Sequence, residues 1–170
     1  MGSDTVTNCN FDDNQANNKG GAVYFWSTGN VSNCNFSNNN AIEDDGRGGA
    51  VYFLDEGTVS NCYFANNTAT VFGGAVYFYS LGSAINCNFT ANRAYGGAVY
   101  FNNASNVTNC NFMGNNATFG SAIYFENSSA ARTISNSTFL NNRADAKTLE
   151  VTINETNIII TFAGNNNLLN

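Results

Sequence analysis

Five cysteines recur at intervals of 23 to 28 residues along the chain, and thiols in this number could bind soft metal ions or form disulfides. The cysteines are Cys9, Cys34, Cys62, Cys87 and Cys110. Their number is odd, no Cys-x-x-Cys pair is present, and Ser137 takes the place of a sixth. We therefore predict reduced, buried thiols that act as small hydrophobic side chains, with disulfide or metal roles as the alternative.

The longest loop and a nearby corner carry an acidic group, together with Arg47, that consists of Glu43, Asp44, Asp45, Asp55 and Glu56; the first four are the candidates for a Ca²⁺ site. Neighbouring carboxylates can bind Ca²⁺, or can act as acid and base in glycoside hydrolysis. However, the spacing is not that of a known calcium loop, and the chain has no histidine. We expect a solvated loop, no cofactor and no catalytic residue. A weak Ca²⁺ site in this loop is the alternative.

Aromatic residues offer the best candidate for binding. A tyrosine recurs in the motif Gly-Gly-Ala-Val-Tyr-Phe and its variant, at Tyr24, Tyr52, Tyr77, Tyr100 and Tyr124. The residue after the motif varies freely and includes Trp26 and Tyr79, which indicates exposure. In a strand, alternation then places Val and Phe inside and Tyr outside. We predict an exposed aromatic face that contacts sugars or proteins, although tyrosine stacking that only stabilises a sheet is the alternative.

These residues belong to a repeat that fills most of the chain. Each copy reads Val-x-Asn-Cys-x-Phe, then Phe-x-x-Asn-x-Ala, a variable loop, and Gly-Gly-Ala-Val-Tyr-Phe. Such a period marks a solenoid, a propeller or an array. No stripe with helical spacing persists, and a propeller blade would need a longer repeat. We predict an all-β, right-handed parallel β-helix (a solenoid) of about six coils, each of roughly 23–28 residues with three short strands.

Asparagines recur in phase with this repeat. One set is expected to stack inside and to bond to the backbone at a corner: Asn14, Asn39, Asn67, Asn92, Asn115 and Asn142. A second set lies between Cys and Phe and should point outward: Asn10, Asn35, Asn88 and Asn111. Asn-x-Ser/Thr sequons are also frequent, which weakly supports a surface location.

We expect a single β-helix domain over 5–162. Residues 1–4 are expected to be a cloning remnant or a disordered start, and 163–170 to begin a truncated further coil or tail. In the last copy, residues 149–153 replace the Gly-Gly-Ala-Val-Tyr-Phe motif and should still form a strand. We read the chain as a piece of a longer repeat protein whose open ends can associate end to end.

The composition excludes several classes of partner. The chain has 170 residues, a net charge of −6 and only six basic residues, so it lacks the positive surface that nucleic acids or anionic membranes attract. No apolar run approaches the length of a membrane span, which argues against membrane insertion. With 43% hydrophobic and 11% charged residues, the chain should fold.

Phe-x-x-Asn and Gly-Gly-Ala-Val/Ile, in phase across residues 5–145, resemble the repeats of chlamydial polymorphic outer-membrane proteins. Together with Asn-Cys-x-Phe-x-x-Asn-x-Ala, they are even more similar to adhesin-like surface proteins of methanogenic archaea. The resemblance implies a right-handed parallel β-helix in an extracellular cell-surface protein that attaches to host or neighbouring-cell glycans or proteins. It carries no catalytic motif. A fragment of a β-helical polysaccharide lyase or hydrolase, and a pure structural spacer, are the alternatives.

Overall fold

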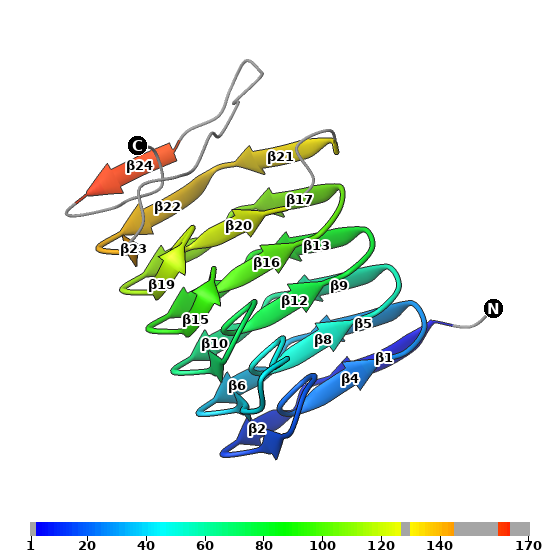
Figure 1. The fold of residues 1–170 in the computed structure, drawn as a ribbon. Coiled ribbons are helices and arrows are strands. Elements are labelled where there is room, and N and C mark those ends of the chain that lie inside the picture. The colour runs from blue at the N-terminus through cyan, green and yellow to red at the C-terminus, as the bar shows by residue number, and fades with distance from the viewer. Residues whose placement is uncertain (1–2, 127–129, 145–159, 164–170) are drawn as a thin grey trace.

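The computed structural model describes residues 3–126, 130–144 and 160–163, and in it the chain winds as a parallel β-solenoid. Strands from successive coils pair in parallel, so that four sheets run along the rod (Figure 1). Within the described residues there is no helix. The predicted all-β parallel solenoid of about six coils is confirmed.

Each of the first five coils contributes one strand to each sheet, in the order A, B, C, D, and the described part of the sixth coil contributes strands to sheets A, B and C. Sheet A contains β1 (Asp4–Thr7), β5 (Gly29–Ser32), β9 (Gly57–Ser60), β13 (Gly82–Ile85), β17 (Ser105–Thr108) and β21 (Arg132–Ser135). Sheet B contains β2 (Asn10–Asp12), β6 (Asn35–Ser37), β10 (Tyr63–Ala65), β14 (Asn88–Thr90), β18 (Asn111–Met113), β22 (Ser137–Leu140) and β24 (Ile160–Ala163). Sheet C contains β3 (Gln15–Ala16), β7 (Asn40–Ala41), β11 (Thr68–Ala69), β15 (Arg93–Gly96), β19 (Asn116–Phe119) and β23 (Arg143–Ala144). Sheet D contains β4 (Val23–Phe25), β8 (Val51–Phe53), β12 (Val76–Phe78), β16 (Val99–Phe101) and β20 (Ile123–Phe125).

The coil has four strands rather than the three expected from the sequence. The additional strand is that of sheet C, which falls on the Asn-x-Ala part of the repeat and is only two residues long in four coils. A strand of two residues shows no alternation of polar and apolar side chains, so the sequence pattern could not reveal it. The strand expected at 149–153 lies outside the described residues.

Residues with a positive φ make the corners between the strands. Between sheets A and B, an asparagine takes this conformation in every coil, at Asn8, Asn33, Asn61, Asn86, Asn109 and Asn136. Before sheet D the same conformation falls on a glycine such as Gly73, where an added Cβ would collide with the carbonyl group of Val76. Asparagine and glycine tolerate this region best, which explains why the repeat keeps them at its corners.

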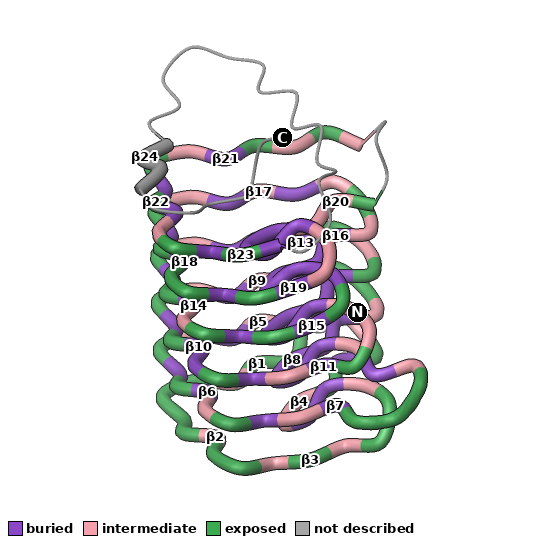
Figure 2. Tube along the Cα trace, turned by 60° about the vertical axis from the view of Figure 1, so that its left-hand side comes forward, coloured by how far each residue is buried: buried purple, intermediate pink, exposed green. Residues whose placement is uncertain are grey.

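Equivalent side chains of successive coils stack into ladders that fill the interior. One ladder of phenylalanines comes from sheet B, with stacked rings 4.8–5.0 Å apart, at Phe11, Phe36, Phe64, Phe89, Phe112 and Phe139. A second ladder faces it from sheet D, starting at Phe25 and Phe53, whose rings are 4.9 Å apart. The buried residues form a continuous column inside the rod (Figure 2). This column stabilises coils that could not bury a core alone.

The internal asparagines form a hydrogen-bonded ladder at the corner between sheets B and C, as predicted. Asn67 is fully buried, and its Nδ2 donates to Asn92 Oδ1 in the next coil at 3.0 Å. The same Nδ2 donates to the carbonyl oxygen of Phe36 in the preceding coil, also at 3.0 Å. The backbone N–H of Asn67 also donates to Asn92 Oδ1 at 3.0 Å. Each amide thus satisfies buried backbone groups of its neighbours, which is the condition for burying a corner.

Candidate functional site

The five predicted tyrosines point away from the phenylalanine core, as alternation requires, but most of them are not exposed. Tyr52, Tyr77 and Tyr100 are only 1–2% exposed and form a second apolar cluster outside sheet D. Tyr124 is half-buried, and Tyr24 is exposed. The prediction of an exposed tyrosine ladder is therefore wrong for its three central members.

The tyrosines are buried because a long side chain from the preceding coil lies over each of them. The residue before the paired glycines covers the tyrosine of the next coil: Lys19 Nζ lies 5.3 Å from the Tyr52 ring, the Arg47 guanidinium 5.6 Å from Tyr77, and the Phe72 ring 4.4 Å from Tyr100. Parallel β-bridges join Lys19 to Arg47 and Arg47 to Phe72, so these three residues form their own short ladder. We call them the covering ladder.

A signal for the covering ladder was present in the sequence. At the position that the covering ladder occupies, four of the five copies hold a long side chain, whereas the fourth copy has Gly96 there; the long side chains are Lys19, Arg47, Phe72 and Phe119. The variable loop hid this regularity because its length differs between copies. Long side chains at this position, interpreted as lying over the outer face of sheet D, would have predicted that the tyrosines are covered.

Part of the predicted aromatic face does reach solvent. Trp26 is 75% exposed and Tyr79 46% exposed, and both follow strands of sheet D. Leu54 lies between them in the stack, since its N–H donates to Phe25 O and the N–H of Tyr79 donates to Phe53 O. Together with Tyr24, they make up a surface that we call the aromatic patch: Tyr24, Trp26, Leu54 and Tyr79.

The rings of the aromatic patch are held in place by one another and by the sheet. The Tyr24 ring lies 6.1 Å from Trp26 in an edge-on arrangement and 5.2 Å from Tyr52. Trp26 and Tyr79 are separated by two coil repeats, which is about 10 Å along the rod. Amphipathic rings on a rigid sheet lose little conformational freedom on binding, so the patch suits contacts with sugars or proteins.

The covered tyrosines are poor acids in this environment. Burial raises the pKa of Tyr52 above its ordinary value, although the nearby Arg47 acts in the opposite direction. Burial also raises the pKa of Tyr77 and, together with a 2.8 Å hydrogen bond to the Glu126 carboxylate, that of Tyr100. These hydroxyl groups are protonated at neutral pH, so the surface above sheet D takes its charge from Lys19, Arg47 and Glu126 rather than from tyrosines.

The acidic group does not form a metal site in this structure. Asp45 pairs with Arg47 at 2.7 Å, and the described residues contain no cluster of three or more acidic, thiol or imidazole groups that could hold an ion. Glu43, Asp44 and Asp55 therefore do not converge with Asp45. A depression of about 260 Å³ at the corner between sheets D and A has Glu56 as its one carboxylate.

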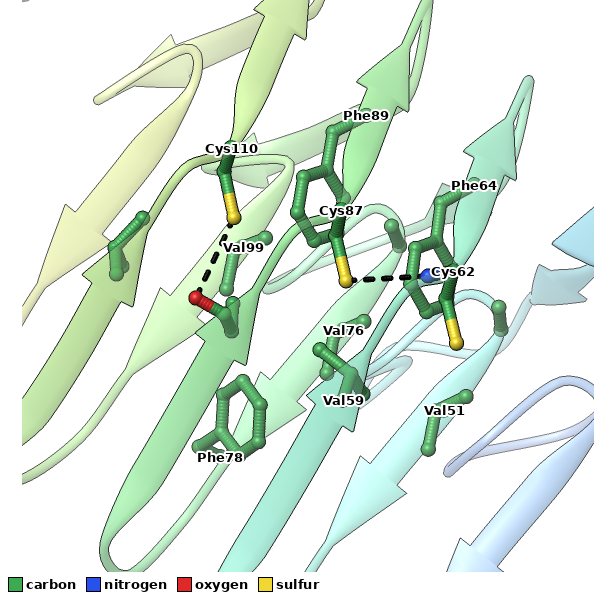
Figure 3. Close-up of a cluster of buried hydrophobic side chains, with 14 of the residues drawn as sticks. Val51, Val59, Cys62, Phe64, Val76, Phe78, Cys87, Phe89, Val99 and Cys110 are labelled. Atoms are coloured by element: carbon green, nitrogen blue, oxygen red, sulfur yellow. Dashed lines mark hydrogen bonds between the residues drawn. The ribbon is translucent and has the colours of Figure 1, made fainter. Parts of the chain in front are cut away.

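The cysteines lie at corresponding positions of successive coils beside the phenylalanines, and they are free thiols, as predicted (Figure 3). Four of them are buried, but Cys9 in the first coil is exposed, so the prediction of burial is wrong for this cysteine. The N–H of Cys62 donates to Cys87 Sγ at 3.4 Å, and the N–H of Cys110 donates to Ser137 Oγ at 3.1 Å. Serine thus takes over the acceptor role of the thiol in the sixth coil. Burial raises the pKa of Cys34, which lowers its reactivity.

The outward asparagines are also where they were predicted. Asn10, Asn35, Asn88 and Asn111 are exposed on sheet B. They bond in pairs along the rod, with Asn35 Nδ2 donating to Asn10 Oδ1 at 2.8 Å and Asn111 Nδ2 donating to Asn88 Oδ1 at 2.9 Å. The exposed ring of Tyr63 separates the two pairs. Sheet B is therefore a polar surface with one central aromatic ring and a single carboxylate, that of Asp12, in its first strand.

Parallel sheets stacked in register, corners built on asparagine and glycine, and a column of phenylalanines define the class of this protein as a parallel β-solenoid. The chain belongs to the right-handed β-helix family, since the family model described as "Right handed beta helix region" matches residues 2–168. No curated protein and no solved structure matches the chain. The described part of the chain contains no helix with the length and apolar character needed to cross a membrane.

Proposed function

We propose that this β-helix is a non-enzymatic part of an extracellular cell-surface protein and that its aromatic patch attaches it to surface glycans. The observation that carries the proposal is the exposure of Trp26 and Tyr79 on the same face of a rigid sheet. Apolar C–H faces of sugars stack on such rings, and exposed aromatic side chains are enriched at recognition surfaces.

Attachment through this patch would be weak for a single sugar chain. The patch consists of four side chains, whereas a stable protein–protein interface involves roughly 20–30 residues a side. On a cell surface, many copies of the patch would meet many glycans at once, and multivalency raises the overall affinity by a factor of about 10²–10⁴. A stiff rod that is displayed in many copies on one cell suits this mode of adhesion.

The test compares the purified protein with a Trp26→Ala/Tyr79→Ser variant on a glycan array, with the protein presented as a multivalent conjugate. Tyr63→Ser is the matched control, since Tyr63 is 42% exposed and lies on sheet B rather than beside sheet D. We expect binding to be lost in the double variant and kept in the control, with unchanged circular dichroism and melting in both. Equal binding by all three proteins would contradict the role of the patch.

Absence of binding by the unmodified protein would favour the spacer, and binding only to proteins of a cell surface would replace glycans as the ligand. Hydrolysis or elimination products from a polysaccharide incubated with the protein would instead support the alternative of a carbohydrate-active enzyme. Each outcome is read directly from the same purified samples.

A further inference from the structure

Two basic residues of the covering ladder stand directly beside each other in neighbouring coils. Lys19 and Arg47 are joined by a parallel β-bridge, in a chain whose net charge is −6 and which has only six basic residues. Like charges directly opposite each other on neighbouring strands are destabilising. Two of the few cations of this protein are thus placed where they repel each other, next to the aromatic patch.

Only one of the two cations has an anionic partner in the part of the chain that the structure describes. Arg47 pairs with Asp45 at 2.7 Å, whereas no carboxylate lies within ion-pair distance of the Lys19 ammonium. The Nε of Arg47 is also buried without a hydrogen-bond partner. Lys19 is half-buried, and its known neighbour is the Tyr52 ring at 5.3 Å, which contacts one side of the ammonium and leaves N–H donors for another group.

The unpaired ammonium is continuous with the aromatic patch. Lys19 lies over Tyr52, the Tyr52 ring is 5.2 Å from that of Tyr24, and Tyr24 is 6.1 Å from Trp26. Tyr24 is 37% exposed and Trp26 75% exposed, so a sugar ring can lie on either of them. A sugar stacked on Tyr24 would bring an acidic substituent on its ring to Lys19.

We propose that the aromatic patch selects acidic saccharides, with the sugar ring stacked on Tyr24 and Trp26 and its carboxylate or sulfate bound by Lys19. This inference rests on the proposed function and names the ligand class for the same site. Arg47 contributes positive potential from the next coil, although Asp45 offsets part of it. Because the protein as a whole is negative, recognition of an anion depends on these local donors rather than on long-range attraction.

The probes are three immobilised polysaccharides that share one backbone and differ in the acidic group: carboxymethyl dextran (carboxylate), dextran sulfate (sulfate) and dextran (neutral). The test variant is Lys19→Gln, and the matched control is Arg93→Gln. Arg93 is an exposed residue of sheet C, so both variants change the net charge by the same amount. Binding is measured by biolayer interferometry with the multivalent conjugate, and melting curves verify that both variants fold.

We expect the unmodified protein to bind at least one acidic probe more tightly than dextran, and Lys19→Gln to weaken that binding roughly 10- to 100-fold, the usual size of one charge-assisted hydrogen bond. Arg93→Gln should stay within about twofold, since a distant exposed charge contributes little. Raising the salt concentration from about 0.05 to 0.3 M should weaken acidic binding and leave dextran binding unchanged. The probe that responds to Lys19→Gln identifies the acidic group.

Equal effects of the two variants, or equal binding of neutral and acidic probes, would overturn the inference. If dextran binding is lost in Trp26→Ala/Tyr79→Ser but unaffected by Lys19→Gln, and acidic probes bind no better, then the glycan site stands and its acidic selectivity is refuted. If the protein binds none of the probes and no glycan on the array, both the site and its selectivity fail.

Discussion

Asn92→Ala should be among the most destabilising single substitutions in this protein. The Asn92 side chain is fully buried, and its Oδ1 accepts from the N–H and Nδ2 of Asn67, both at 3.0 Å. Its Nδ2 donates to Phe64 O at 3.0 Å and to Asn115 Oδ1 at 3.1 Å. Alanine removes all four bonds and leaves at least the Asn67 N–H and the Phe64 carbonyl buried without this partner.

Each buried group that loses its partner costs about 1–3 kcal/mol, so the free energy of unfolding should fall by roughly 2–6 kcal/mol. That is a large share of the ~5–15 kcal/mol typical of a folded domain. With a urea m-value of about 2 kcal/mol/M, the midpoint of unfolding should shift down by roughly 1–3 M. Far-UV circular dichroism in urea measures this shift directly.

The matched control is Asn88→Ala in the same coil, because Asn88 is exposed on sheet B. Its loss should change the free energy of unfolding by less than about 0.5 kcal/mol, as is usual for a surface substitution. If the two substitutions changed the free energy of unfolding by amounts within about 1 kcal/mol of each other, the hydrogen bonds of the internal ladder would contribute little to stability, and the reasoning would be refuted.

Three further predictions follow from the burial of aromatic and thiol groups. Tyr77→Ser should lower the free energy of unfolding by about 3–5 kcal/mol, whereas Tyr79→Ser should change it by less than about 0.5 kcal/mol in urea titrations; similar effects would contradict the difference in burial. A thiol reagent should modify Cys9 rapidly and the other four cysteines only on unfolding, and fast labelling of all five would exclude the packed core. Burial raises the pKa of Tyr52 and Tyr100, so their contribution to the free energy of unfolding should be fully present below the unfolded-state pKa of about 10 and should be lost as the pH rises above it. The urea midpoint should therefore fall at alkaline pH, and a constant midpoint would refute the effect.

The repeat predicted the architecture because each position of a coil has the same environment in every copy. Phenylalanines, cysteines and internal asparagines recur in phase, so their burial followed from the period and the alternation alone. The two-residue strands of sheet C escaped because they are too short to show a pattern. A register that repeats is visible in a sequence, whereas a pairing that involves two residues is not.

The candidate site was predicted only in part. Alternation correctly placed Tyr77 outside the phenylalanine core, yet it could not show that Arg47 from the preceding coil lies over the ring. Contacts between a loop and the next coil depend on the path of the loop, which no local pattern encodes. Trp26 and Tyr79 follow the strands rather than lying in them, and their variability between copies did indicate exposure. The role of Lys19 became visible only when its neighbours were known.

The internal asparagines make the rod directional. Each side-chain amide from Asn14 to Asn115 donates to the side-chain oxygen of the asparagine in the next coil. The bonds between asparagine side chains therefore all point the same way along the rod, while the same amides also donate to a phenylalanine carbonyl group of the preceding coil. A whole coil can be duplicated or deleted inside the array, and the flanking amides will meet again with the same polarity. The length of such a rod can thus change by whole coils in a single genetic event, which offers a simple route to surface proteins of different reach.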